Sequence, residues 1–439
     1  MSDTARAGYA PTPKRGNPHA LRFAMITTFY PPYSFGGDAI AIRRLSEALV
    51  RRGHDVTVVH DVDAYNALHD GPEPAPGRAL GGPTVVPLRS GLGVLSPLLT
   101  QQTGRPIVHG GRIRRLLNDE AFDIVHFNNV SLVGGPGVLS AGGGVKVYEA
   151  HEHWLVCPTH VLWRHGREVC TGRECLRCVL HHRRPPQLWR YTGYLDRQLR
   201  EIDLLIAKSE FSRRKHHEFG LDRPMDVLPY FLPDLEGGEA GRTGGDPHRA
   251  HDRPYFLFVG RLERIKGLDD LIPVFGDYAD ADLLIAGDGT DGTRLRRSAE
   301  GHPRVRFLGP VSPEALEAYY RDALALIVPS ICFETFGIIL IEAFRQRTPV
   351  IARRIGPFPE IVEACGGGEL FESRGELVEA MRRIQRDPAH RERLARSAIR
   401  GFRERWSESA VVPRYLGLVG EAAERSGRGD IARAIESAA

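Results

Sequence analysis

Short apolar runs alternate with amphipathic stretches along most of this chain. An apolar run bounded by Gly, Pro or polar residues predicts a buried strand, and helical spacing of apolar residues predicts a helix. In the first half, strands are expected at residues 21–29, 55–60, 122–127, 145–149, 203–207 and 226–229. In the second half, they are expected at residues 255–259, 281–286, 305–308, 325–328 and 349–352. Because strands that alternate with helices build covered parallel sheets, the pattern predicts an α/β protein with two doubly wound, Rossmann-like domains.

Breaks in this alternation divide the chain. Residues 233–254 are rich in Gly and charge, and we interpret them as a linker between a first domain at 21–232 and a second at 255–405. Residues 61–104 are rich in Pro and Gly, and they predict loops over the first domain. Residues 406–425 predict a helix long enough to cross back to the first domain.

Composition narrows the class of protein. The chain has 439 residues, 42% of them apolar, and a net charge of +4, which is small for this length. Such a balance does not require a nucleic-acid partner, and no apolar run approaches the ~20 residues that span a bilayer. Residues 1–20 are polar and lack the apolar core of a secretion signal, so we expect a disordered leader and a cytoplasmic location without a transmembrane segment. Peripheral contact with a membrane stays open.

Glycines and charged residues follow several of the predicted strands, at the edge where parallel sheets bind ligands. Arg261 and Lys266 lie across one turn, and two cations aimed at one diphosphate could replace a divalent metal ion. The alternative is that both side chains belong to a solvated turn. The candidates at strand ends are Gly36, Gly37, His151, Gly260, Arg261, Lys266, Gly287 and Glu334.

Two glutamates bracket the start of a predicted helix. Glu334 precedes it and Glu342 lies about two turns along it, roughly 12 Å further at 1.5 Å per residue. Between them, the free N–H groups of Phe336, Gly337 and Ile338 would suit an anion. A nucleotide sugar has this layout, with hexose hydroxyls for Glu334, a diphosphate for the helix start and ribose hydroxyls for Glu342. The alternative is two glutamates that simply flank an amphipathic helix.

A short insert at residues 153–182 gathers four cysteines. Cys175 and Cys178 have the two-residue gap of a metal knuckle, and four thiolates can close a tetrahedral zinc site together with Cys157 and Cys170. The gaps between the first three cysteines do not match a standard zinc finger. A structural zinc is therefore our interpretation, and free thiols or an iron–sulfur cluster remain alternatives.

Taken in order, several motifs resemble the retaining glycosyltransferases of family 4, a family with the GT-B fold of two facing Rossmann-like domains and a deep cleft between them. The cysteine-rich insert resembles that of one subgroup. The motifs are Tyr30-Pro31-Pro32 with Gly36-Gly37, His151-Glu152, Gly260-Arg261-Leu262 with Lys266-Gly267, Gly287-Asp288-Gly289, Leu308-Gly309, and Glu334-Thr335-Phe336-Gly337 to Glu342-Ala343.

The resemblance implies a role for each of these residues. Arg261 and Lys266 would hold the donor diphosphate, Glu334 would contact the hexose, and His151 would line the reacting centre. These four are the predicted catalytic residues. The predicted donor-binding residues are Gly36, Gly37, Gly260, Gly287, Leu308, Gly309, Thr335, Phe336, Gly337, Ile338 and Glu342.

The same resemblance implies transfer of a hexose from a nucleoside diphosphate sugar, most often a UDP sugar, to an acceptor hydroxyl. The departing phosphate would act as the base, without a metal cofactor for the chemistry. A sugar-nucleotide 2-epimerase of the same fold is the first alternative. A zinc-containing nucleic-acid-binding protein is a remote one, because the basic run Arg183-Arg184 is short.

Overall fold

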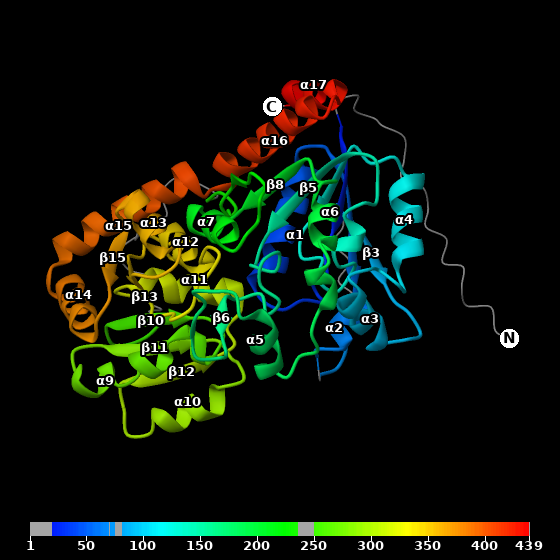
Figure 1. Ribbon diagram of the computed structural model, residues 1–439. Helices are drawn as coiled ribbons and strands as arrows, with labels where there is room; N and C mark the ends of the chain where they lie inside the picture. The colour runs from blue at the N-terminus through cyan, green and yellow to red at the C-terminus, as the bar shows by residue number, and fades with distance from the viewer. Residues whose placement is uncertain (1–19, 70, 75–80, 236–249, 439) are drawn as a thin grey trace.

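A computed structural model describes residues 20–69, 71–74, 81–235 and 250–438 (Figure 1). The predicted leader at 1–20 lies outside these ranges except for its last residue, as does the middle of the predicted linker. Within these ranges the strands form two large parallel sheets, one of seven strands and one of six, and each belongs to a different half of the chain. The prediction of two Rossmann-like α/β units is confirmed.

The first sheet has the strand order β3-β2-β1-β4-β5-β8-β9. Its strands are β1 Arg22–Ile26, β2 Asp55–Asp61, β3 Thr84–Leu88, β4 Ile124–Phe127, β5 Val145–Ala150, β8 Leu204–Ala207 and β9 Asp226–Val227. Helices cover both faces, so side chains of one strand enter two cores in turn. In β1, Phe23 and Met25 join one apolar cluster, whereas Ala24 and Ile26 join the other. The helices are α1 Gly37–Arg51, α2 Val62–Asn66, α3 Leu95–Thr103, α4 Gly110–Asp119, α6 Tyr194–Leu199 and α7 Glu210–Glu218.

The prediction of loops for residues 61–104 is wrong. This segment contains α2, the strand β3 and α3. β3 forms the edge of the sheet and pairs in parallel with β2. Its proline, Pro87, weakens the strand signal in the sequence, yet a proline is tolerated on an edge strand because it need not donate to a second neighbour.

The second sheet has the order β12-β11-β10-β13-β14-β15. Its strands are β10 Tyr255–Val259, β11 Asp282–Ala286, β12 Val305–Gly309, β13 Leu326–Val328, β14 Val350–Arg353 and β15 Gly368–Phe371. The first five agree with the predicted ranges to within one residue at each end. β15 was not predicted, because Gly368 and Glu369 leave it almost without an apolar run. The helices of this half are α8 Leu268–Leu271, α9 Val274–Asp277, α10 Gly292–Ser298, α11 Pro313–Asp322, α12 Ile338–Arg345, α13 Phe358–Cys365, α14 Arg374–Arg386 and α15 Pro388–Arg405.

The chain returns to its first half through α16, Glu408–Arg425, followed by α17, Gly429–Ala438 (Figure 1). Val412, Tyr415 and Val419 of α16 pack into the same apolar cluster as Ile42 and Leu49 of α1. This burial of apolar surface fixes the C-terminal segment on the first domain.

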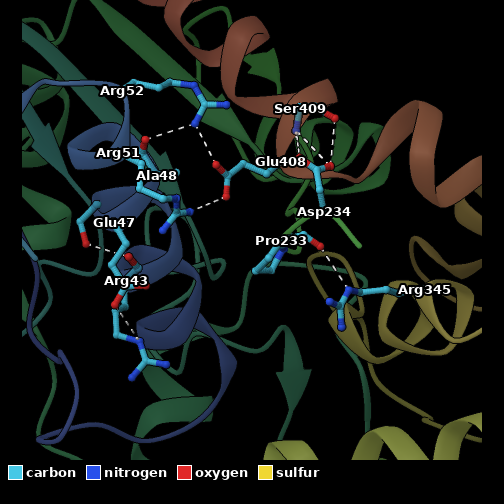
Figure 2. A network of polar contacts seen from close by, with 11 residues as sticks. Arg43, Glu47, Ala48, Arg51, Arg52, Pro233, Asp234, Arg345, Glu408 and Ser409 are labelled. Atoms are coloured by element: carbon cyan, nitrogen blue, oxygen red, sulfur yellow. Dashed lines mark hydrogen bonds and ion pairs between the residues drawn. The ribbon is translucent and has the colours of Figure 1, made fainter. Parts of the chain in front are cut away.

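Polar contacts also hold the start of α16 against the first domain (Figure 2). Glu408 at the start of α16 pairs with Arg51, the last residue of α1, at 2.5 Å and with Arg52, the residue after it, at 2.9 Å. Ser409 donates from its hydroxyl to Asp234 at 2.9 Å, so the outgoing and returning segments lie side by side. No helix among the described residues is long and apolar enough to cross a membrane.

Candidate active site

A cleft of about 820 Å³ lies where the carboxyl ends of the two sheets face each other. This volume is within the usual range for a small-molecule site. Its walls come from both halves of the chain, with Phe35 and Asn129 on one side and Ser330 and Phe358 on the other. The predicted site residues that line it are Gly36, Gly37, His151, Gly260, Arg261, Lys266, Gly287, Glu334, Thr335, Gly337 and Ile338.

Four predicted donor-binding residues do not line the cleft. Leu308 and Gly309 end β12, and the next residue, Pro310, is the one that reaches the cleft wall. The Phe336 side chain is buried in the core of the second domain, so only its backbone is available near the helix start. The fourth is Glu342.

Glu342 is held by neighbours outside the cleft. Tyr320 donates to its Oε2 at 3.0 Å, and Arg44 of α1 in the first domain lies 3.9 Å from its Oε1. Burial raises the pKa of Glu342, and the Arg44 charge opposes this rise. Its expected place two turns along the helix was also wrong: α12 begins at Ile338, so Glu342 lies about one turn, or about 6 Å, beyond the helix start.

Lys266 and Glu334 form an ion pair in the cleft. Lys266 follows β10 and Glu334 follows β13, and their Nζ and Oε1 atoms are 2.5 Å apart. Burial alone would lower the pKa of Lys266, but the Glu334 carboxylate raises it above its usual value. Burial would raise the pKa of Glu334, but Lys266 and then Arg261 hold it below its usual value. Both groups are therefore charged at neutral pH.

Arg261 is an exposed cation beside this pair. Its side chain is 59% exposed, and it contacts Glu263 at 2.7 Å. An exposed ion pair of this kind exchanges partners at little cost, so the guanidinium can turn toward an anion in the cleft. Arg261 and Lys266 thus place two cations at the same end of the second sheet.

The start of α12 supplies N–H groups to the same space. Gly337 precedes the helix with φ of +112° and no side chain caps it. A Cβ at this position would lie 2.8 Å from the Phe358 ring, so both conformation and space favour glycine. Because the first N–H groups of a helix have no partner within it, they are able to accept an anion in the cleft that Lys266 also lines.

Gly287 allows two loops to meet on the donor side. Its φ is +132°, and a Cβ there would lie 2.0 Å from the carbonyl oxygen of Gly260. Across the cleft, a Cβ on Gly37 would lie 3.1 Å from Ile338, so the starts of α1 and α12 approach closely. A ligand at the start of α12 would therefore touch the first domain as well as the second.

His151 is a buried residue of the first-domain wall of the cleft. Its Nδ1 lies 2.8 Å from the Tyr230 hydroxyl and its Nε2 lies 2.9 Å from the Asn128 side-chain oxygen. Burial lowers the pKa of His151 to about 4, so the imidazole is neutral at physiological pH. Its carbonyl oxygen accepts a hydrogen bond from the Thr335 hydroxyl at 2.9 Å, which joins the two domains beside the cleft.

Sequence reasoning missed two residues of the first-domain wall, Asp38 and Asn129. Burial raises the pKa of Asp38, while the neighbouring His151 opposes the rise, and Asn129 donates a hydrogen bond to the carboxyl group. The position of Asp38 directly after Gly37 could have marked it. Tyr230 was missed as well, and its 79-residue separation from His151 left no local signal.

Two family profiles match the chain, one for each domain. The profile described as Glycosyltransferase Family 4 matches residues 35–232, and that of Glycosyl transferases group 1 matches residues 246–401. The chain belongs to glycosyltransferase family 4. Members of this family are retaining glycosyltransferases that use nucleotide-sugar donors.

Individual relatives of this glycosyltransferase support the same family and fold. A phosphatidyl-myo-inositol mannosyltransferase of Mycobacterium leprae is 32% identical over 407 residues, which are 90% of this chain and 96% of the relative. The structure of sucrose-phosphate synthase from Thermosynechococcus elongatus has a TM-score of 0.69 at 20% identity, covering 92% of this chain and all of the other. HepE of Anabaena, solved with UDP, has a TM-score of 0.62 at 16% identity and covers 91% of this chain and all of the other. The GT-B prediction is confirmed.

The cysteine insert of this glycosyltransferase folds as a small hairpin, β6 Trp163–Arg164 and β7 Glu168–Val169, followed by the helix α5, Cys175–His181. Cys157, Cys170, Cys175 and Cys178 form no disulfide bond. Burial and then the nearby Cys157 raise the pKa of Cys175, so the thiols lie near one another. No three of their sulfur atoms lie within 4.8 Å of one another, however. Among the described residues, the one group of three possible metal ligands that is this close contains no cysteine. The zinc site stays a prediction.

The insert also touches the cleft. Nδ1 of His160 lies 2.7 Å from the Glu152 carboxylate. Glu152 lines the first-domain wall of the cleft, and so does Val161, which follows His160 in the insert. A change in the insert would therefore reach the first-domain wall of the cleft directly.

Proposed function

We propose that this glycosyltransferase moves a hexose-type sugar from a nucleoside diphosphate donor to an acceptor hydroxyl with retention of configuration. A UDP sugar is the preferred donor. The observation that carries the proposal is the Lys266–Glu334 pair beside the uncapped start of α12. A cation, open N–H groups and a carboxylate in one interdomain cleft match the diphosphate and the hydroxyls of such a donor.

The two cations are proposed to stabilise the leaving diphosphate. Each charged hydrogen bond contributes roughly 1.5–3 kcal/mol, and in a closed cleft these bonds strengthen as negative charge grows on the leaving oxygen. Glu334 accepts from hexose hydroxyls while Lys266 keeps it ionised. The Thr335 backbone and the Ile338 N–H group orient the same sugar.

The first domain is proposed to hold the acceptor. Phe29, Phe35 and Asn129 give this wall apolar and polar surface, and the acceptor hydroxyl would approach the face that the phosphate leaves. The departing phosphate then takes the proton, so no carboxylate nucleophile and no metal ion are needed for the transfer. His151, being neutral, would shape the pocket and would not serve as a cationic acid.

Glu342 is proposed to bind the ribose after a small rearrangement. Its present partners are Tyr320 and Arg44, and Arg44 belongs to the other domain. Ribose hydroxyls would replace the long contact to Arg44, since 3.9 Å is too far for a hydrogen bond. The four thiols of the insert are proposed to hold one structural zinc ion, a ligand set typical of such sites.

The experiment is a donor screen with UDP-glucose, UDP-galactose, UDP-N-acetylglucosamine and GDP-mannose, with and without candidate acceptors. We expect one donor to be consumed in an acceptor-dependent manner, with an α-linked product by NMR from an α-linked donor. A β-linked product would contradict retention. Conversion of the donor without an acceptor to an altered sugar nucleotide would instead establish the epimerase.

A further inference from the structure

Three buried side chains meet at the carboxyl edge of the first sheet, apart from the donor site. Asp61 ends β2, Asp63 lies in the first turn of α2, and His109 immediately precedes α4. Their exposed fractions are 0%, 5% and 5%. Three segments that are distant in sequence therefore converge on one polar cluster inside the domain.

The ligand atoms of these residues are spaced as they would be around one ion. Nε2 of His109 lies 3.0 Å from Oδ2 of Asp63 and 3.9 Å from Oδ1 of Asp61, and one ligand atom from each residue falls within 4.8 Å of the others. For an ion about 2.1 Å from each atom, these two separations correspond to angles of about 90° and about 135°. Both are within the range for ligands of a single metal ion.

The charges of the cluster are not balanced by protein groups. Asp63 accepts from the Ser90 hydroxyl at 2.6 Å and from His109, and Asp61 accepts from the Ala64 N–H, 3.0 Å from its Oδ1. Its Oδ2 is buried without a hydrogen-bond partner. Among the described residues, no lysine or arginine pairs with either carboxylate. One imidazole cannot neutralise two buried carboxylates, and a buried unpaired charge is costly.

We propose that Asp61, Asp63 and His109 bind one divalent transition-metal ion, of the Zn²⁺ or Mn²⁺ class. Two carboxylates and an imidazole are ligands that such ions accept, whereas Ca²⁺ takes six to eight oxygens. The ion would bind Asp61 through Oδ1, and its charge would compensate a buried carboxylate whose Oδ2 has no hydrogen-bond partner.

The position of the cluster indicates what the ion does. Tyr65 of α2 stacks on Phe35 with ring centroids 4.9 Å apart, and Phe35 lines the cleft. The Asp61 N–H also donates to the Thr28 carbonyl at 3.1 Å, at the base of the loop that carries Phe35. An ion that ties β2, α2 and α4 together would therefore fix the first-domain wall of the cleft. It does not touch the donor residues, and the inference is independent of the proposed function.

The test compares metal content in the full-length wild-type protein, Asp63→Asn and a matched control, His54→Asn, which alters a buried histidine with no carboxylate partner. Each protein is dialysed against Zn²⁺ or Mn²⁺ separately and its metal is counted by mass spectrometry. We expect Asp63→Asn to hold one ion fewer per chain than the other two and to show a smaller metal-dependent rise in melting temperature. Equal metal content in all three would overturn the proposal.

A second measurement covers the case in which Asp63→Asn does not fold. Wild-type crystals soaked in Zn²⁺ give an anomalous difference map that locates each ion directly. A peak between Asp61, Asp63 and His109 supports the site, and it is distinct from any peak at the cysteine insert. No peak at saturating Zn²⁺ would overturn the proposal.

Discussion

Removing the Lys266 ammonium tests the proposed chemistry in the most informative way. In Lys266→Met, the diphosphate loses one charged hydrogen bond, worth roughly 1.5–3 kcal/mol. At 1.4 kcal/mol per tenfold change, UDP affinity should fall about 10- to 150-fold. Turnover should fall further than affinity, since the leaving diphosphate gains charge in the transition state and the lysine stabilises it most there.

The same substitution also leaves Glu334 without its nearest cation. A loss of stability caused by that unpaired carboxylate must therefore be separated from a loss of UDP binding. The pKa of Glu334 should then rise, because burial remains while Lys266 no longer opposes it. Adding Glu334→Gln removes that stranded charge and should restore thermal stability. It should not restore UDP affinity, because the diphosphate still lacks its cation.

Calorimetric titration with UDP measures the affinity, and Lys146→Met is the matched control. Lys146 is a buried lysine that pairs with Glu201 at 3.7 Å and lies outside the cleft. We expect wild-type affinity from the control. If Lys266→Met binds UDP as tightly as Lys146→Met does and turns over at the wild-type rate, the reasoning is refuted.

Three further predictions address the fold, the pH response and the insert. Gly287→Ala should destabilise the protein by about 1–3 kcal/mol in urea titration, because a Cβ would meet the Gly260 carbonyl; an unchanged midpoint would show that the loops can separate. The pKa of His151 is about 4 in the folded protein and 6.5 in the reference state, so the unfolded chain binds more protons between these values. Stability should fall as pH drops from 6.5 to 4, by at most about 1.4 kcal/mol per pH unit for this group, and less steeply in His151→Gln; equal slopes for both proteins would count against the assignment. Cys175→Ser should impair folding or acceptor use while UDP affinity stays at the wild-type value, and a variant normal in every respect would argue against a role for the insert.

The sequence predicted the second domain better than the first. Its strands are continuous apolar runs such as Tyr255–Val259, which a buried parallel strand requires, and they fall close to the expected ranges. Edge strands carry weaker signals: β3 contains Pro87 and β15 begins with Gly368, and each is covered on fewer sides than a central strand. A local apolar pattern indicates a buried strand, so strand prediction from this pattern fails where the strand is only partly buried.

Most of the candidate site could also be found in sequence, because strand ends and glycine turns mark it locally. The partners of each residue could not. Lys266 and Glu334 are 68 positions apart, and the contact of Glu342 with Arg44 depends on how the two domains face each other. A periodicity argument also misplaced Glu342, since the helix begins only after Gly337.

The central claim is that a nucleoside diphosphate binds at the start of α12 beside Arg261 and Lys266. Calorimetric titration of the purified protein with the diphosphates of uridine, guanosine, adenosine and thymidine tests it most directly, with Arg261→Ala and Glu342→Ala measured in parallel. We predict selective binding of one diphosphate, UDP, weakened in both variants. Folded protein that binds none of the four, or binds them equally well after Arg261 is removed, would contradict the claim.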